Sequence, residues 1–333
     1  MKNIRKRLAV LLVLCFVVSL APLALADDAT GGTCGENATW TLEDGVLTIS
    51  GMGAMQDYTS RDEIPWYPLR DTITSAVVAD GITSIGEGAF AICSSLSSVT
   101  LPNSVTSIGY AAFSECSNLT SVTIPDSVTS IGDWAFESCT SLTSVTLPDS
   151  VTSIGGAAFT DCTGLTSITI PSGVTSIGSD ENGAFDGCLN LTEILVSADN
   201  AAFTAEDGIL FNKDKTVLVC YPAGKAGAYT IPGSVTSLYT DAFAWCSGLT
   251  SITIPDSVVT LGGWSFYFCD NLTSVTIPSS VTSIGDYTFD GCTSLTEILV
   301  DAGNPAFTAE DGILFKNDKT EMFCYPANKV CVS

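Results

Sequence analysis

Short runs of alternating apolar and polar residues return at a fixed interval along most of the chain. The stretch "LTSVTIPDSVTSIGDWAFESCTS", residues 119–141, is followed by the near copy "LTSVTLPDSVTSIGGAAFTDCTG". Eight phenylalanines mark the units, most of them 23 residues apart: Phe90, Phe113, Phe136, Phe159, Phe185, Phe243, Phe266 and Phe289. Self-similarity at a period of this length is typical of proteins whose repeats stack on one another.

Each unit predicts the same local structure. In "LTSVTI" β-branched residues alternate with Ser and Thr, which indicates a strand with one buried face, and Pro125 ends it because proline has no N–H to give to a sheet. Gly132 permits a bend into "DWAFESC", a short helical or 3₁₀ turn that places Phe136 in the interior. A lone unit cannot bury its apolar face. We therefore expect an α/β-type solenoid dominated by β-structure, right-handed, with a parallel sheet on one face and short helical or 3₁₀ turns on the other.

The outward strand positions form two rows of hydroxyl groups, which we call the Ser/Thr face. Its members are Ser98, Thr100, Ser121, Thr123, Ser144, Thr146, Ser167, Thr169, Ser251, Thr253, Ser274 and Thr276. In curved solenoids such a sheet usually lines the concave side, which is the common binding surface. The Ser/Thr face is therefore a candidate binding face, although Ser and Thr also suit outward strand positions in water without any ligand.

The repeated pattern L-x-x-V-x-I-P-x-x-V-T-S-I-G-x-x-A-F-x-x-C, carried by nearly all of residues 76–333, resembles the BspA-type leucine-rich repeat of bacterial surface and secreted proteins. The stretch "CGENATWTLEDGVLTISGMGAM", with "IPWYPLR" after it, is also similar to the N-terminal segment of such proteins. The resemblance implies a surface or secreted role in adhesion and protein–protein interaction, without a particular ligand. We expect a β-rich capping segment over 27–75 and a leucine-rich-repeat solenoid over 76–333.

Two longer units, 191–231 and 295–333, interrupt the simple repeat. In the first, "GILF" and "TVLVCYP" flank a polar "NKDK", which predicts a hairpin with a four-residue turn. Most lysines beyond the N-terminus lie in these units. The lysine-containing turn is therefore either a cationic contact site or a solvated hairpin tip. The second copy ends in "VCVS" where the first continues with "AGAYTIP", which favours a truncated product or a fragmentary reading frame.

The N-terminus has the pattern of a secretory signal peptide. Four basic residues precede an apolar run from Leu8 to about Leu23, and "ALA" follows it before Asp27. The apolar run is shorter than the roughly 20 residues of a membrane span. We expect cleavage of residues 1–26, a secreted or cell-surface location, and no membrane insertion afterwards.

Charge and histidine content narrow the function. The chain has 12 Lys+Arg against 36 Asp+Glu, and an acidic surface repels phosphate backbones, which argues against nucleic acid as a partner. There is no histidine, which excludes His-based general bases, Ser-His-Asp triads and His metal ligands. The chain also has no Gly-rich phosphate loop or nucleophile elbow. The sequence predicts a non-catalytic protein without a cofactor or metal site.

Cysteine recurs at one position of the unit and forms a predicted ladder. The ladder is Cys93, Cys116, Cys139, Cys162, Cys188, Cys246, Cys269 and Cys292. Export suggests disulfides, but stacked units would hold these thiols with parallel Cβ vectors, between core Phe and Leu positions. We therefore interpret the ladder as buried, structural thiols. Cys324 and Cys331, outside it, are close enough in sequence to pair.

Two further recurring positions carry side chains that could bind a ligand. Asp126, Asp149 and Asp256 share one turn position and are expected to bond nearby backbone N–H groups, with weak Ca²⁺ binding as the alternative. A second position, two residues before the core Phe, carries what we call the aromatic edge: Trp134, Trp264 and Tyr287. These rings either offer a stacking surface or pack at the margin of the core.

Three functions remain open from the sequence. The first is an exported leucine-rich-repeat protein that binds a host or microbial surface protein. The second is a carbohydrate-binding surface module that uses the Ser/Thr face and the aromatic edge. The third is a spacer rod without a ligand.

Overall fold

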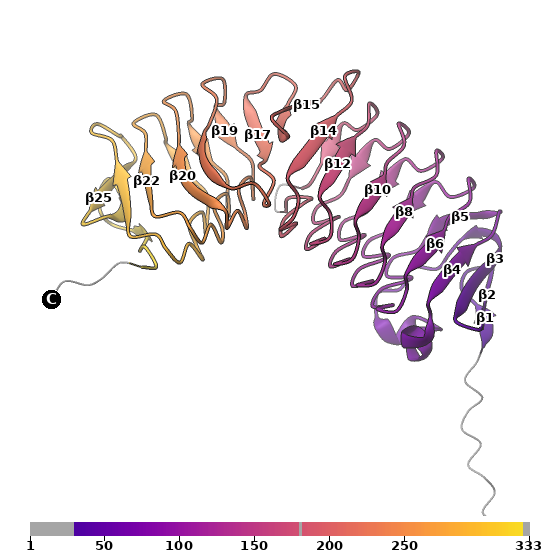
Figure 1. Ribbon diagram of the computed structural model, residues 1–333. Coiled ribbons are helices and arrows are strands. Elements are labelled where there is room, and N and C mark those ends of the chain that lie inside the picture. Colours follow the sequence, from indigo (N-terminus) through magenta and orange to yellow (C-terminus); the bar gives the residue numbers. More distant parts are fainter. Residues whose placement is uncertain (1–29, 180–181, 329–333) are drawn as a thin grey trace, which may run out of the picture.

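The computed structural model describes residues 30–179 and 182–328, so the predicted signal peptide lies outside the described residues. The chain forms a β-solenoid whose coils lie side by side along an arc (Figure 1). Each regular coil carries a first strand from the "TSVTI" part of the unit and a two-residue second strand from "TSI". The predicted solenoid is confirmed, and the second strand is an addition to the one strand per unit that the pattern indicated.

The N-terminal segment is a three-stranded antiparallel meander that joins the solenoid through its last strand. β1 (Gly31–Thr33), β2 (Asn37–Glu43) and β3 (Val46–Ala54) pair in order. β3 then pairs in parallel with both β4 (Ser75–Val78) and β5 (Ile82–Ile85). Two 3₁₀ helices, η1 (Arg61–Glu63) and η2 (Tyr67–Thr72), follow β3. Between them Trp66 is fully buried and donates its indole N–H to the Ala89 carbonyl at 2.9 Å, which fastens this segment to the first coil.

The first strands associate as parallel two-stranded ribbons. They are β6 (Ser98–Thr100), β8 (Ser121–Thr123), β10 (Ser144–Thr146), β12 (Ser167–Ile170), β14 (Glu193–Val196), β18 (Gly227–Thr230), β20 (Leu249–Thr253), β22 (Ser274–Ile277) and β24 (Glu297–Val300). The ribbons are β8–β10, β12–β14, β18–β20 and β22–β24, whereas β6 pairs with β4, which also pairs with β3.

The second strands form longer parallel ladders. Their members are β7 (Ser107–Ile108), β9 (Ser130–Ile131), β11 (Ser153–Ile154), β13 (Ser176–Ile177), β19 (Ser237–Leu238), β21 (Thr260–Leu261) and β23 (Ser283–Ile284). One ladder runs from β5 to β13 and the other from β17 to β23.

The two longer units each add an antiparallel three-stranded sheet. The first is β15 (Phe203–Glu206), β16 (Ile209–Asn212) and β17 (Val217–Cys220); the second is β25 (Phe307–Glu310), β26 (Ile313–Lys316) and β27 (Met322–Cys324). The predicted hairpin around "NKDK" is confirmed by the pairing of β16 with β17. A tighter hairpin precedes it, because Asp207 and Gly208 adopt φ values of 50° and 75°, as a two-residue turn of the primed type requires.

The turns that follow each second strand contain no helix, which corrects the expected helical or 3₁₀ turn. Within the described coils the backbone alternates instead. Ala135, Glu137 and Cys139 donate their N–H to carbonyls of their own coil, whereas Trp134, Phe136 and Ser138 donate to Gly156, Ala158 and Thr160 of the next coil at 2.8–2.9 Å. In an α-helix all of these backbone N–H groups would donate to carbonyls of the same helix. The alternation instead joins each coil to the next.

This geometry requires positive φ, in the left-handed region, at two positions of the turn. One position lies two residues before the core Phe, and the other lies two residues after it. Non-glycine residues with positive φ there are Ala111, Trp134, Ala157, Asp241, Trp264 and Tyr287 at the first position and Ile92, Glu115, Ser138, Asp161, Trp245 and Phe268 at the second. Each costs on the order of 1 kcal/mol or more. The hydrogen bonds between coils offset that strain.

The core is a stack of aromatic rings in two blocks. Phe90, Phe113, Phe136, Phe159 and Phe185 stack in order with centroids 5.0–5.8 Å apart. After the first long unit Tyr221 replaces phenylalanine and starts a second stack, 4.9 Å from Phe243, that continues through Phe266 to Phe289. The buried residues form two hydrophobic clusters that meet at this long unit.

The assignment of inward and outward faces predicts unequal costs for two substitutions in one coil. Phe136 is fully buried and Ser121 is exposed. Phe136→Ala should lower the free energy of unfolding by about 3–5 kcal/mol, and Ser121→Ala should change it by less than about 0.5 kcal/mol. Urea titrations followed by circular dichroism measure both. Equal losses would mean that the faces are assigned wrongly.

Candidate functional site

The structure places all twelve residues of the Ser/Thr face at exposed positions of the first strands. The two rows are in register where strands pair: Ser144 lies beside Ser121, and Thr146 beside Thr123. The face carries hydroxyl groups that both donate and accept hydrogen bonds, and its own twelve positions hold no charge. It could contact a partner over a long strip, although nothing in its geometry selects a ligand.

The long units change the chemistry of these rows, which sequence reasoning missed. Glu193 takes the Ser position beside Ser167, and Leu195 takes the Thr position beside Thr169. The same pair recurs in the second block as Glu297 and Leu299. Both leucines are 44% exposed. Each block of the Ser/Thr face therefore ends in a carboxylate next to an exposed leucine, and the signal was the repeated "LTEILV" of the two long units.

The aromatic edge is divided by the fold. Trp264 and Tyr287 stack with ring centroids 5.5 Å apart, and Tyr287 is 61% exposed. Trp134 lies in the other block, where Ala111 and Ala157 hold the equivalent positions of the flanking coils. The structure therefore brings two of the three predicted rings together.

A second aromatic group lies at the neighbouring turn position, and the sequence analysis did not single it out. Trp245 stacks on Phe268 at 4.4 Å, and the Tyr267 ring stands edge-on to both. In these stacks the rings present their faces to one another. A sugar stacks on a flat ring face, and in the pairs Trp245–Phe268 and Trp264–Tyr287 one face of each ring is already covered by the other ring.

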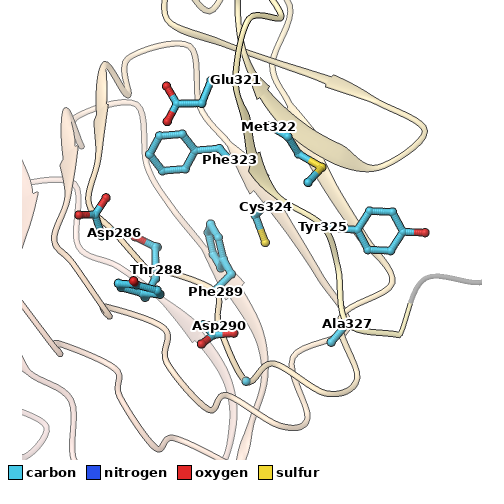
Figure 2. A pocket seen from close by; sticks show the side chains of 12 residues that line it. Asp286, Thr288, Phe289, Asp290, Glu321, Met322, Phe323, Cys324, Tyr325 and Ala327 are labelled. Carbon is cyan, nitrogen blue, oxygen red and sulfur yellow. The ribbon is translucent and has the colours of Figure 1, made fainter.

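A cavity of about 480 Å³ lies between the last regular turn and the final hairpin (Figure 2). Asp286 and Asp290 approach it from the turn, and Glu321 and Phe323 from the hairpin opposite. Its lining also includes Tyr287, Phe289 and Tyr325. Among the residues that the structure describes, no lysine or arginine lines it, although Lys316 forms an ion pair with Glu321. We call this cavity the acidic aromatic pocket.

The cysteine ladder lies in the core. All eight thiols are buried and free. The Cys139 thiol donates to the carbonyl of Phe113 at 3.2 Å, and Cys162 donates to Phe136 at 3.1 Å. Burial raises the pKa of the Cys139 thiol to about 12. A protonated, buried thiol is a poor nucleophile, so this arrangement supports packing and a link between coils. Cys331, the suggested partner of Cys324, lies outside the described residues.

Free, buried thiols predict slow chemical modification. In the folded protein a thiol reagent such as 5,5′-dithiobis(2-nitrobenzoate) should leave the ladder unmodified on the time scale of minutes, whereas denaturant should expose every thiol. Counting released chromophore with and without urea measures this. Rapid reaction of eight thiols in the folded state would contradict the buried ladder.

The recurring turn aspartates serve the contact between coils where the structure shows their bonds. Asp149 Oδ1 accepts the backbone N–H of Ser172 at 2.9 Å and its hydroxyl at 2.7 Å, and these bonds lower the pKa of the Asp149 carboxyl. Asp126 and Asp256 are exposed. Among the described residues no group of three potential ligands is placed to hold a metal ion.

Two carboxyl groups meet where the blocks join. Asp186, beside the last ring of the first stack, lies next to Asp241 across a space of about 10 Å³ that Tyr239 also lines. Asp241 Oδ2 accepts the Gly183 N–H at 3.1 Å. Burial, and then the neighbouring Asp241, raise the pKa of Asp186 well above its usual range, and burial raises the pKa of Asp241. Asp161 and the thiols of Cys188, Cys220 and Cys246 are the other titratable groups nearby.

This carboxyl pair predicts an unusual pH dependence. A folded-state pKa above the unfolded value stabilises the fold at low pH, and that contribution is lost as pH rises through the folded pKa. Stability should therefore fall from about pH 4, near the unfolded pKa, toward neutrality, and Asp241→Asn should flatten the fall. Urea midpoints between pH 4 and 8 measure it, with exposed Asp126→Asn as the control. The same slope in both variants would contradict the role of the pair.

The described residues contain no helix long and apolar enough to cross a membrane. The lysines of the first hairpin are engaged: Lys215 pairs with Glu206 at 2.7 Å, and Lys225 donates to the Asp207 carbonyl at 2.9 Å. Surface pairs of this kind contribute little stability. They do remove part of the free positive charge that a cationic contact site would need.

Comparison with known proteins identifies the repeat. A family model described as the BspA type leucine rich repeat region, in 6 copies, matches residues 70–192 and 220–326. A leucine-rich repeat protein from Eubacterium ventriosum is 38% identical, with a TM-score of 0.75 over 82% of this chain and 72% of that chain. A leucine rich cell surface protein from Faecalibacterium prausnitzii is 27% identical, with a TM-score of 0.52 over 82% and 95%.

A more distant structure shares the fold alone. The pneumococcal vaccine antigen PcpA is 20% identical, with a TM-score of 0.60 over 82% of each chain. No curated protein matches.

Proposed function

The chain belongs to the BspA-type leucine-rich repeat family, and from that premise we propose that it is an exported, non-catalytic protein of the bacterial surface that binds another protein through its Ser/Thr face. The observation that carries the proposal is the exposure of all twelve hydroxyl side chains of this face. Leucine-rich repeat proteins generally bind proteins, and solenoids use extended surfaces of this kind. The partner is a host or microbial surface protein.

Export and surface location rest on two supports. Residues 1–26 have the pattern of a secretory signal peptide. One similar structure is named as a cell surface protein, at 27% identity. We propose that the mature chain begins near Asp27, with a capping segment to residue 75 and the solenoid from residue 76, the longer units being 191–231 and 295–333.

Physical chemistry favours a protein as the ligand over a sugar. Protein interfaces tolerate an uncharged polar surface that supplies many hydrogen bonds and bridging waters. A sugar site would use ring faces of the aromatic edge, but Trp264 and Tyr287 stack at 5.5 Å, which covers one face of each ring, and Trp134 lies in the other block. A carbohydrate-binding module and a spacer rod without a ligand are therefore the alternatives that the following experiment separates.

The proposal predicts that charge and bulk on the Ser/Thr face abolish binding. The purified chain 27–333 is used as bait for surface proteins and on a glycan array. Thr123→Arg with Thr146→Arg should weaken a protein hit roughly tenfold or more, since a clash and a desolvated charge in an interface cost at least about 1.4 kcal/mol. Thr129→Arg, which changes an exposed threonine beside the second-strand ladder, is the matched control.

The outcomes differ clearly. Loss in the double variant with binding kept in the Thr129→Arg protein supports the Ser/Thr face. Equal binding in all three proteins contradicts it. A glycan hit without a protein hit favours the carbohydrate-binding module, and silence in both screens from folded protein favours the spacer rod.

A further inference from the structure

The two residues that end the first block of the Ser/Thr face differ in chemistry from the rows that they interrupt. Glu193 lies beside Ser167 and Leu195 beside Thr169, in register on the paired strands β14 and β12. We call Glu193 and Leu195 the first block end, and it lies near the middle of the arc (Figure 1). The next first strand, β18, pairs with β20 in a separate ribbon, so the hydroxyl rows break directly after this strand.

The hairpin of the long unit holds the first block end in place. Ile194 donates its N–H to the Gly208 carbonyl at 2.9 Å, while β14 is also paired with β12. Gly208 lies so close that a Cβ atom there would come within 3.1 Å of the Glu193 Cα and 3.2 Å of its Cγ. Its φ of +75° also favours glycine. Glu193 therefore projects from a fixed backbone, which lowers the entropy cost of binding a partner.

No cation of its own unit is paired with Glu193. The unit 191–231 has three lysines and no arginine. Each lysine has a partner elsewhere: a backbone carbonyl for Lys213 and for Lys225, and another carboxylate for Lys215. Among the described residues the exposed Glu193 side chain has no hydrogen bond or ion pair. A rigid, unpaired carboxylate favours a basic side chain of a partner over an acidic one.

Leu195 adds an apolar contact at a defined distance from this charge. It is 44% exposed even though its strand has a neighbour on each side, β12 and the hairpin. Its exposure therefore does not come from an open end of the solenoid. Glu193 and Leu195 are two residues apart on one strand, so they project from the same face about 6.6 Å apart. A partner segment in extended conformation has the same interval between its residues i and i+2.

We propose that the first block end recognises an extended segment of the protein partner that carries arginine or lysine and, two residues away, an aliphatic residue. This rests on the proposed function, because the same partner contacts the hydroxyl rows of the Ser/Thr face. The basic side chain bonds the Glu193 carboxylate, and the aliphatic side chain covers Leu195 and removes its apolar surface from water. The site selects a position, since the rows before it present the same hydroxyls at every coil.

The same pair recurs as Glu297 and Leu299 in the second block. We confine the site to the first block end, because the second long unit runs into residues 329–333, which lie outside the described residues. The test therefore uses the purified chain 27–333 with Glu297→Ser and Leu299→Thr, which we call the reference protein. These changes restore the residue types that the neighbouring strand holds at Ser274 and Thr276.

The probe is a fluorescein-labelled nonapeptide with the sequence Gly-Ser-Thr-Arg-Thr-Leu-Thr-Ser-Gly. Three comparison peptides replace arginine by citrulline, replace leucine by serine, or place arginine and leucine next to each other. Fluorescence anisotropy with the reference protein measures the dissociation constants. We expect each comparison peptide to bind at least about fivefold more weakly, because it loses the charged hydrogen bond, the apolar contact or the matching interval. Equal binding of all four peptides, or no measurable binding of the probe, would overturn the proposal.

Variants of the reference protein assign the binding to the first block end. Glu193→Ser with Leu195→Thr continues the hydroxyl rows through β14, so the protein should fold and bind the probe about tenfold or more weakly. Asp126→Asn with Leu189→Thr is the matched control. It removes one exposed carboxylate and one leucine of nearly equal exposure, 45%, elsewhere, and should change binding less than twofold.

Equal losses in the two double variants would overturn the proposal, because attraction would then come from overall charge and scattered apolar surface. Undiminished binding in the block-end variant would overturn it as well. Circular dichroism checks that each variant is folded, and Glu193→Gln alone replaces the block-end variant if that protein is not.

The result is separable from that of the Ser/Thr face. If the block-end variant binds the probe as the reference protein does, while Thr123→Arg with Thr146→Arg loses the partner, the block-end site fails and the proposed function stands. If the block-end variant loses the probe while the arginine double variant keeps every partner, the block-end site stands and the Ser/Thr face fails.

Discussion

The structure depends on one interaction above the others, the alternating backbone hydrogen bonds of the turns. Every second N–H, such as those of Trp134, Phe136 and Ser138, donates to the next coil, and this is possible only because residues on either side of the core Phe adopt positive φ. The local strain is repeated in coil after coil. It persists because the stacked rings, the buried thiols and the hydrogen bonds between coils fix the same register. A single coil would have the strain without the neighbours that offset it.

The repeat pattern predicted the solenoid because period and alternation are properties of the chain itself. The first strand follows from alternating side chains, and the buried Phe and Cys positions follow from their recurrence. The form of the turn did not follow. "DWAFESC" has composition compatible with a helical turn, and only the next coil, which accepts its N–H groups, decides for the alternating form. Trp134 and Ile92 at positive φ are conformations that residue preference argues against.

The candidate sites also divide into one that the sequence predicts and others that it does not. Exposure of the Ser/Thr face could be predicted, because it depends only on which side of a strand a residue occupies. The acidic aromatic pocket could not, because it joins a turn at 286–291 to a hairpin strand more than 30 residues later. The meeting of Asp186 with Asp241 was hidden for the same reason. The sequence Phe-Asp-Gly-Cys occurs at both places, at 185–188 and at 289–292, and its two copies look alike in the sequence.

Repetition also limits where specificity can lie. The hydroxyls of Ser121, Ser144 and Ser167 present the same group at each step, so a ligand held by them alone could slide by one coil at little cost. Features that interrupt the repeat fix the register: the carboxylate and leucine that end each block, Glu193 with Leu195 and Glu297 with Leu299. A partner that contacts the Ser/Thr face across one of these block ends gains affinity from the hydroxyl rows and a fixed position from the carboxylate and leucine. This follows from the fold. Identical coils present the same groups to a partner at every step, whereas an interrupted coil presents different groups and so defines one position.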